Sequence, residues 1–288
     1  MAPIIKTEGV THVYSAGTAF ERAALTGVDF EAERGEYVGV IGHTGSGKST
    51  FIQTLNGLIK PTSGAVFFDG ADIRESKERT REVRCKVGLV FQYPEYQLFE
   101  ETVFRDIAFG PKNMGLAEPE IEERVREAAD FVGLDGSDLE KSPFELSGGQ
   151  RRRAAIAGVI AMRPQVLIAD EPTAGLDPSG SAEIMANIGA YRRSTGAAVI
   201  IVTHSMEDIA RNADRVTVFD RGRIVMDDSP ARTFARGEEL SAMGLGVPAA
   251  VAVAGRLRAR GLPIADGVIT VEGLRASLRG LRGGAGGV

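Results

Sequence analysis

The sequence has little of what secreted and membrane-spanning proteins contain. It has one cysteine, Cys85, which cannot form an internal disulfide and has no metal-ligand neighbours, so we expect it in the core. No apolar run approaches the roughly 18 residues that a membrane-spanning helix needs. The first eight residues lack the basic-then-apolar layout of a signal peptide. We therefore expect a globular protein of the cytoplasm, and the 43% hydrophobic content is ordinary for that class.

A general surplus of positive charge is also missing. Residues 230–288 hold eight arginines and four acidic residues, so this tail carries net +4. The preceding 229 residues carry 26 basic and 35 acidic side chains, which is net −9. Nucleic-acid binding needs a basic face, so the acidic body argues against it. The basic tail could touch a membrane surface or an acidic partner, although a solvated helix face is the commoner explanation.

One stretch, residues 42–50, fits the phosphate-binding pattern GxxxxGK(S/T). Apolar residues 37–41 predict a buried strand before it, and the spacing over 51–57 predicts a helix after it. The glycines let successive N–H groups point at one anion, and the helix start adds a positive field. Lys48 supplies an ammonium for the outer phosphates and Ser49 a hydroxyl for Mg²⁺. The sequence therefore predicts a nucleoside triphosphate site, formed by Gly42, His43, Thr44, Gly45, Ser46, Gly47, Lys48, Ser49 and Thr50.

Another predicted strand, residues 87–91, is followed directly by Gln92. A glutamine at such a strand end could ligate Mg²⁺ through its amide oxygen and orient the attacking water. The alternative is a glutamine that only caps the strand. The Pro- and aromatic-rich loop at 93–99 favours the first interpretation.

The sequence Leu-Ser-Gly-Gly-Gln at 146–150 precedes a predicted helix over 151–162. Ser147 is placed as its N-cap, and the two glycines clear the backbone so that a phosphate could lie at the helix start. We predict that the arginines at 151–153 form a solvated or salt-bridged face rather than a phosphate clamp. The motif residues are Ser147, Gly148, Gly149 and Gln150.

Two further apolar strands end in polar residues. The strand at 166–169 leads into Asp170, which suits Mg²⁺ contact, and Glu171, which lies where a general base could polarise water. The strand at 198–202 leads into His204, at the kind of sheet edge where ligands gather. A lone histidine is more often structural, and adjacent acids alone are weak evidence.

The ends of the chain complete the prediction. The first strand, 4–14, places Tyr14 where its ring could stack on adenine, with His12 and Phe20 as competitors. From Ser229 onward, short helical pieces separated by Gly and Pro predict a small helical appendage. We expect the last six residues, 283–288, to be flexible.

Taken in order, these motifs resemble those of the ATP-binding-cassette (ABC) ATPases, over roughly residues 4–235. The motif at 146–150 is the most specific, because other phosphate-loop NTPases lack it. The resemblance implies an α/β fold with a phosphate-loop core sheet, an antiparallel β subdomain and a helical signature subdomain. This nucleotide-binding domain would span 1–235, and a helical appendage with a Gly-rich end would span 236–288.

A narrower resemblance is to the ATPase subunits of energy-coupling factor (ECF) importers. It rests on the loop at 41–50 with His43, on LNGLIKPTSG at 55–64, and on FQYPEYQLFEETV at 91–103 with Phe-Gly-Pro at 109–111. The Tyr-Pro-Glu and Leu-Phe-Glu-Glu sequences look more like the second of the two paralogous subunits. The resemblance therefore implies an ATP-hydrolysing motor subunit that drives uptake of a vitamin or a transition-metal ion.

The family resemblance also implies roles for the motif residues. Two cassettes would face head to tail, with each ATP between the loop at 42–50 of one and the motif at 146–150 of the other. The Asp177 loop would join the nucleotide site, and Tyr14 would stack on adenine. The remaining implied roles are Mg²⁺ binding by Ser49, Gln92 and Asp170, water activation by Glu171, and positioning of that water by His204.

Partners and location follow from the same resemblance. It implies a second ABC ATPase subunit (a copy or a paralogue), an integral membrane scaffold subunit and a membrane substrate-binding subunit. The loop after Gln92 would transmit closure to the scaffold, and the protein would lie peripherally on the cytoplasmic face of the cell membrane. Two alternatives stay open, namely the ATPase of another ABC importer and a soluble cassette outside transport. A DNA-maintenance cassette is disfavoured because no long coiled-coil insertion is present, and a scaffold ATPase because it would not need the aromatic loop at 93–99.

Overall fold

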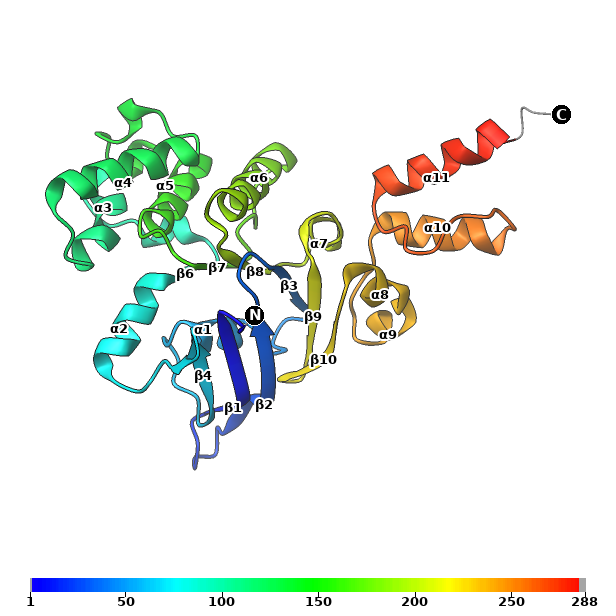
Figure 1. The fold of residues 1–288 in the computed structure, drawn as a ribbon, viewed down its shortest axis with the longest axis horizontal. Helices are drawn as coiled ribbons and strands as arrows, with labels where there is room; N and C mark the ends of the chain where they lie inside the picture. Colours follow the sequence, from blue (N-terminus) through cyan, green and yellow to red (C-terminus); the bar gives the residue numbers. More distant parts are fainter. Residues whose placement is uncertain (1, 285–288) are drawn as a thin grey trace.

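A mostly parallel sheet of six strands forms the centre of the computed structural model, which describes residues 2–284 (Figure 1). Its order is β10-β9-β3-β8-β7-β6, and only β9 and β10 pair antiparallel. Four strands are buried at every position, as expected when helices or a second sheet cover both faces. The strands are β3 (Tyr37–Gly42), β6 (Val87–Val90), β7 (Val166–Asp170), β8 (Ala198–Val202), β9 (Arg215–Asp220) and β10 (Arg223–Asp228).

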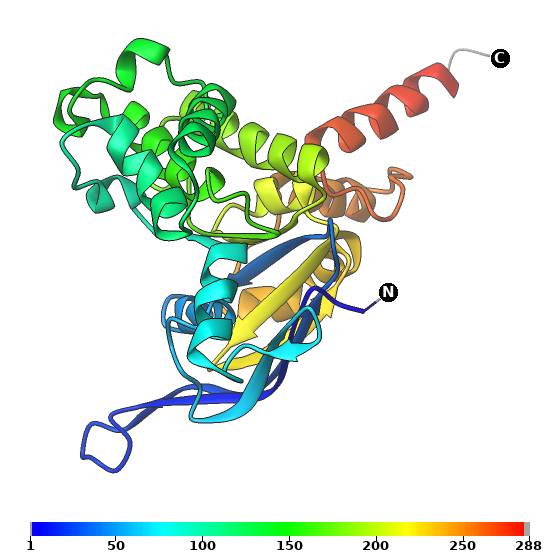
Figure 2. The same cartoon turned by 60° about the vertical axis from the view of Figure 1, so that its left-hand side comes forward.

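The second sheet is antiparallel, with the order β2-β1-β4-β5. Its strands are β1 (Ile5–Tyr14), β2 (Arg22–Ala32), β4 (Ser63–Phe68) and β5 (Ala71–Asp72). Strands β1 and β2 form a long hairpin that extends away from the green helices in Figure 2. Tyr14 pairs with Arg22 at the far end of this hairpin.

The helices form three groups. In Figure 1, α3, α4 and α5 gather at one end of the molecule and α8 to α11 at the other, with the sheets between them. Helices α1 and α2 lie near the antiparallel sheet, and α6 and α7 follow β7 and β8 in the chain. The bounds are α1 (Lys48–Leu55), α2 (Lys77–Lys86), α3 (Val103–Asn113), α4 (Glu118–Phe131), α5 (Gly148–Ile160), α6 (Pro178–Thr195), α7 (Met206–Asn212), α8 (Pro230–Ala235), α9 (Gly237–Ala242), α10 (Ala249–Ala259) and α11 (Val271–Gly284), with short 3₁₀ turns η1 (Pro94–Gln97), η2 (Gly136–Asp138) and η3 (Pro143–Glu145).

Buried apolar side chains hold these layers together. One cluster joins the central sheet to α3–α6, and another fills the space between the two sheets around Phe51 and Phe219. A third cluster packs Phe234 of α8 and Leu240 of α9 with Val218 of β9. Helices α10 and α11 have a small cluster of their own. The predicted α/β cassette, with an antiparallel sheet, a helical subdomain and C-terminal helices, is confirmed.

One local prediction is wrong, and one helix was not predicted. Cys85 is not in the core but half-buried beside a surface groove, because its helix α2 buries only Val83. That helix was not predicted, since its charged sequence shows little apolar periodicity. Helix α3 contains Pro111 near its end at Asn113, where the proline removes a single hydrogen bond.

After β10 the chain is helical from α8 to α11, as the sequence predicts. The proposed domain boundary at 235 falls between α8 and α9, which share one apolar cluster, and it stays a prediction. Residues 283 and 284 belong to α11, whereas residues 285–288, also predicted to be flexible, lie outside the described residues. Within residues 2–284, no helix has the length and apolar character that crossing a bilayer requires.

Candidate nucleotide site

The phosphate loop connects β3 to α1, as the sequence predicts. Two of its glycines are required by close approaches of the backbone. A Cβ at Gly42 would lie 2.4 Å from the Phe219 carbonyl oxygen, and one at Gly47, where φ is +108°, would lie 2.5 Å from that of Ala24. Because Gly47 is also the N-cap of α1, the free N–H groups of the first helical turn face the same space as the loop.

Lys48 lies in this loop with only 6% of its surface exposed. Its ammonium donates to the carbonyl oxygens of Gly42 and His43, the latter at 3.0 Å. Burial lowers the pKa of Lys48, while the nearby carboxylates of Glu171 and Asp170 act in the opposite direction. A desolvated cation of this kind is suited to receive a polyanion.

Asp170 ends β7 directly beside the loop. It is 7% exposed, and burial raises its pKa, although a hydrogen bond from Ser49 and the charge of Lys48 partly offset this effect. The pair places a hydroxyl and a carboxylate together, which are oxygen donors of the kind that Mg²⁺ prefers. Ser49 and Asp170, two of the three residues predicted as Mg²⁺ ligands, are thus adjacent, and the third, Gln92, lines the same pocket.

Glu171 and His204 meet at the carboxyl edge of the sheet. Because β7 and β8 are paired in register, with Asp170 opposite Val202, the residues that follow them are neighbours. His204 Nε2 lies 2.7 Å from Glu171 Oε1. Glu171 has a φ of +48°, which is rare for a residue with a side chain and is common at functional sites.

A pocket of about 380 Å³ brings most of the predicted residues together. Gly42, His43 and Ser46 do not line it, and the His43 ring instead contacts Asp220 at 3.0 Å. The Tyr14 hydroxyl lies 3.2 Å from Thr50 Oγ1, and Tyr14, which lines the pocket, is 41% exposed. The lining residues are Tyr14, Arg22, Ala24, Thr44, Gly45, Gly47, Lys48, Ser49, Thr50, Gln92, Asp170, Glu171 and His204.

Arg22 was missed by the sequence analysis. It begins β2 and reaches the pocket because β2 pairs with the end of β1 beside Tyr14. The register of this hairpin is irregular at three places, so the sequence offered no means of placing Arg22 at the loop.

The motif at 146–150, called the signature motif below, lies outside this pocket. Ser147 is the N-cap of α5, and its side chain forms a reciprocal capping box with Gln150. Asp177 is the N-cap of α6 and accepts a hydrogen bond from the Gly180 N–H. Neither the residues at 147–150 nor Asp177 line the pocket around Lys48. One chain therefore holds two separate parts of the predicted site.

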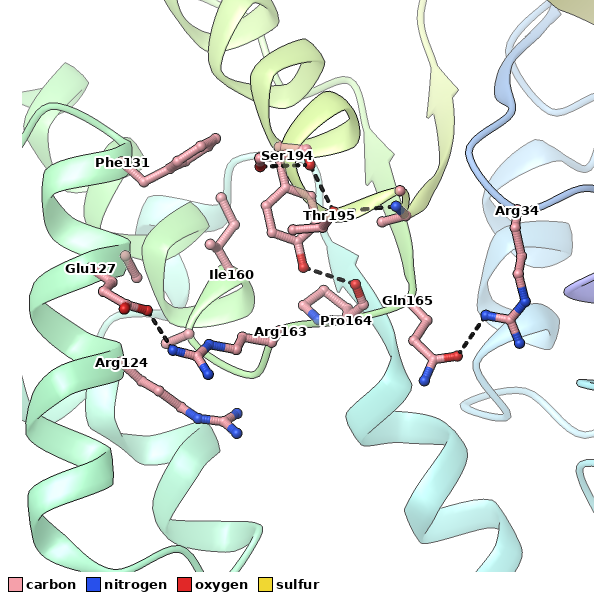
Figure 3. A pocket seen from close by; sticks show the side chains of 15 residues that line it. Arg34, Arg124, Glu127, Phe131, Ile160, Arg163, Pro164, Gln165, Ser194 and Thr195 are labelled. Atoms are coloured by element: carbon pink, nitrogen blue, oxygen red, sulfur yellow. Dashed lines mark hydrogen bonds and ion pairs between the residues drawn. The ribbon is translucent and has the colours of Figure 1, made fainter.

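Two other hollows differ from this pocket in chemistry. The one in Figure 3, of about 400 Å³, lies between α4 and the end of α6, with Arg124 and Arg163 at its edge. There the Tyr191 hydroxyl donates to the Pro164 carbonyl at 2.8 Å. It contains none of the motif residues, and Gln165 and Ala197, which line it, directly precede the starts of β7 and β8 rather than follow their ends.

The third hollow is an apolar groove of about 580 Å³ beside the loop that follows Gln92. Leu98 and Phe99 line it from that loop, and Phe109 lines it from α3. Asp106 holds the loop in place by accepting hydrogen bonds from the N–H groups of Phe99 and Glu100, at 3.1 and 3.2 Å. Tyr96 is outside the groove lining and 80% exposed.

Comparison with known proteins agrees with this geometry. The ABC transporter family model matches residues 25–174. The "Energy-coupling factor transporter ATP-binding protein EcfA2" of Caldanaerobacter subterraneus subsp. tengcongensis is 52% identical, over 97% of this chain and 98% of the relative. The protein of the same name from Symbiobacterium thermophilum is 54% identical over 96% of each chain.

Two solved structures are similar in fold. The cbiO1 protein of Clostridium perfringens, described as part of the ABC transporter complex cbiONQ, superimposes with a TM-score of 0.73 at 40% identity, over 84% of this chain and 94% of that one. The ATP-binding cassette MJ0796, a dimer bound to ADP and Pi, gives 0.71 at 29% identity, over 78% and 98%.

Proposed function

Because the chain belongs to the ABC transporter family, as an ATP-binding subunit of an energy-coupling factor transporter, we propose that ATP hydrolysis around Lys48 and Glu171 drives the import of a vitamin or a transition-metal ion. The observation that carries the proposal is the contact of Glu171 with His204 in the same pocket as Lys48. A triphosphate bound by the loop would lie between a cation and a paired carboxylate.

ATP binding is assigned to the loop and to the hairpin. The N–H groups at the start of α1 and the ammonium of Lys48 would hold the phosphates. Tyr14, exposed at the pocket wall, would stack on the adenine, and Arg22 would add a cation beside it. Gly42, His43 and Ser46, which do not line the pocket, would stabilise the conformation of the loop.

The residues also fit Mg²⁺. Ser49 and Asp170 lie together in the pocket, where Ser49 lowers the pKa of the carboxyl, and Gln92 lines the same pocket. Bound Mg²⁺ would neutralise charge that develops on the transferred phosphoryl group. These three residues are the proposed ligands.

Glu171 is the proposed general base. Its Oε1 is engaged by His204, so Oε2 is the oxygen left to accept a proton from the attacking water. His204 fixes the orientation of the carboxylate and would also contact the γ-phosphate. Glu171 lines the pocket and has a positive φ, a conformation that is common at functional sites.

A second ABC subunit would complete each site. The residues at 147–150 do not line the Lys48 pocket of their own chain. The free N–H groups at the start of α5 would therefore be available to a phosphate of the nucleotide bound by a second subunit. The dimeric arrangement of the cassette MJ0796, which is 29% identical, supports this proposal. Asp177, at the start of α6, would join the same contact.

The groove at Leu98 and Phe109 is the proposed contact with an integral membrane scaffold subunit. It is apolar and adjoins the loop that begins at Gln92, so a helix seated there would be linked to the nucleotide site. The cbiO1 protein, described as part of the ABC transporter complex cbiONQ, supports such partners. The chain would then lie peripherally on the cytoplasmic face of the membrane, with solute selected by a separate membrane subunit.

The experiment that tests this function is affinity purification of the chain from its native membranes, followed by mass spectrometry and an ATPase assay. We expect an integral membrane scaffold and a second ABC ATPase to co-purify, with Mg²⁺-dependent ATPase activity. Recovery of no integral membrane protein, in a detergent that preserves such complexes, would contradict the transport proposal.

A further inference from the structure

Arg152 is a buried cation outside the nucleotide pocket. It lies on α5, two residues beyond the signature motif at 146–150, and only 2% of its surface is exposed. The cost of burying a guanidinium is high unless its donors are paired. The partners of Arg152 therefore show which segments this residue connects. They come from two segments that the sequence separates widely.

The first partner is Glu95, in the turn η1 that follows Gln92. Arg152 Nε donates to Glu95 Oε2 at 2.9 Å and Nη2 donates to Oε1 at 2.6 Å, which is a bidentate pair. Burial alone would raise the pKa of Glu95, but the hydrogen bonds and charge of Arg152 outweigh it and lower that pKa. The ring of Tyr93 lies 5.8 Å from the guanidinium carbon and covers its face.

The second set of partners follows the proposed base Glu171. Arg152 Nη1 donates to the backbone carbonyls of Pro172, at 3.4 Å, and Ala174. The Ala174 N–H in turn donates to the Glu171 carbonyl at 3.1 Å, so these residues form one turn. Glu171 has a positive φ in this turn, and a conformation of that kind persists only where surrounding contacts hold it.

We propose that Arg152 is a positioning residue that transmits the placement of the signature helix to the turn behind Glu171 and to the loop after Gln92. Movement of α5 relative to the central sheet would change both contacts at once, because one guanidinium makes them. The groove loop and the base would thus respond together to engagement of the signature motif. This inference rests on the proposed function, since it concerns the rate of the same ATPase reaction.

Stability is a weak explanation for this pair. Buried ion pairs replaced by apolar residues of similar size are often as stable or more so, whereas removal of one partner leaves an unpaired charge. The neighbouring pair of Arg153 with Glu183, at 3.1 Å, is partly exposed and touches neither loop. It provides a matched comparison on the same helix.

The test replaces both partners, Arg152→Met with Glu95→Met, in the full chain within the assembled transporter. Equilibrium binding of ATP should stay close to wild type, because the phosphate loop is untouched. The kcat of ATP hydrolysis should fall by about 10²-fold, the usual result of a misplaced catalytic group. The control, Arg153→Met with Glu183→Met, should leave both quantities near wild type.

The possible results separate the two proposals. A kcat within twofold of wild type in a folded Arg152/Glu95 double variant overturns the positioning role. The proposed function itself is unaffected by that result if Glu171→Gln, assayed in parallel, is inactive. Loss of ATP binding and thermal stability together with kcat would indicate a merely structural role and also overturns the inference.

If the double variant does not fold, Arg152→Lys takes its place. Lysine keeps the charge but cannot reach both Glu95 oxygens and two carbonyls with one planar group. We expect a lower kcat with ATP affinity preserved, and an unchanged kcat would count against the proposal in the same way.

Discussion

Glu171 Oε1 lies 2.7 Å from His204 Nε2, although 33 positions separate the two residues in the chain. The contact exists because β7 and β8 are adjacent and in register. It leaves one oxygen of the carboxylate free toward the Lys48 pocket. The predictions below begin from this arrangement.

Glu171→Gln should preserve ATP binding and lower turnover by about 10²–10⁴-fold, because an amide cannot accept the proton of the attacking water. ATPase assays together with equilibrium ATP binding measure the two effects separately. Glu183→Gln, an exposed glutamate on α6, is the control and should retain activity. Turnover near wild type in Glu171→Gln would remove this residue from the role of base.

Lys48→Ala and Ser147→Arg should affect different halves of the site. Lys48→Ala removes the loop cation, so the chain alone should lose tight ATP binding. Ser147→Arg leaves that pocket intact, so ATP binding by the chain alone should persist while turnover of the assembled complex falls to background. Lys60→Ala and Ser137→Arg change exposed positions and serve as controls. Loss of ATP affinity in Ser147→Arg would contradict the placement of the signature motif on a second subunit's nucleotide.

Asp170→Asn should abolish Mg²⁺-dependent turnover without lowering the stability of the nucleotide-free chain at neutral pH. Because burial raises the pKa of Asp170 in the folded state, the ionised carboxylate destabilises that state at pH values above the folded pKa. Asparagine removes this effect, so thermal unfolding at pH 7 should occur at the same or a higher temperature. The difference should disappear as the pH falls to about 3.9, where the unfolded carboxyl also protonates. A lower midpoint at pH 7 would contradict the sign of the shift.

Leu98→Asp should weaken assembly with the membrane scaffold, because it places a charge in the apolar groove. ATP binding by the isolated chain should persist, since Leu98 does not line the nucleotide pocket. Co-purification and ATP binding measure the two properties. Phe20→Asp, at an 86% exposed aromatic in the β1–β2 hairpin, is the control and should assemble normally. Normal assembly of Leu98→Asp would place the contact elsewhere.

The sequence alone determined the parts of this protein that depend on short-range physics. The loop at 42–50 is a strand, a turn and a helix in direct succession, so its glycines and Lys48 could be placed without knowledge of the rest. The buried strands read as apolar runs, and Ser147 could be recognised as a helix N-cap because capping is a contact between near neighbours. The charged helix α2 and the partial exposure of Cys85 were not predicted, since neither leaves a periodic apolar pattern.

Only the tertiary structure decided which of these parts meet. Strand order and register bring His204 to Glu171, and hairpin register brings Arg22 to the phosphate loop. The contact of Arg152 with Glu95 spans 57 positions, and the arginine run that contains it gave no sign that one member is buried. Such contacts depend on how separate elements pack, and the free energy of packing is shared over many residues rather than encoded in a local pattern. The same packing keeps the signature motif away from its own chain's Lys48, and on this separation rests the proposal that a second subunit completes the site.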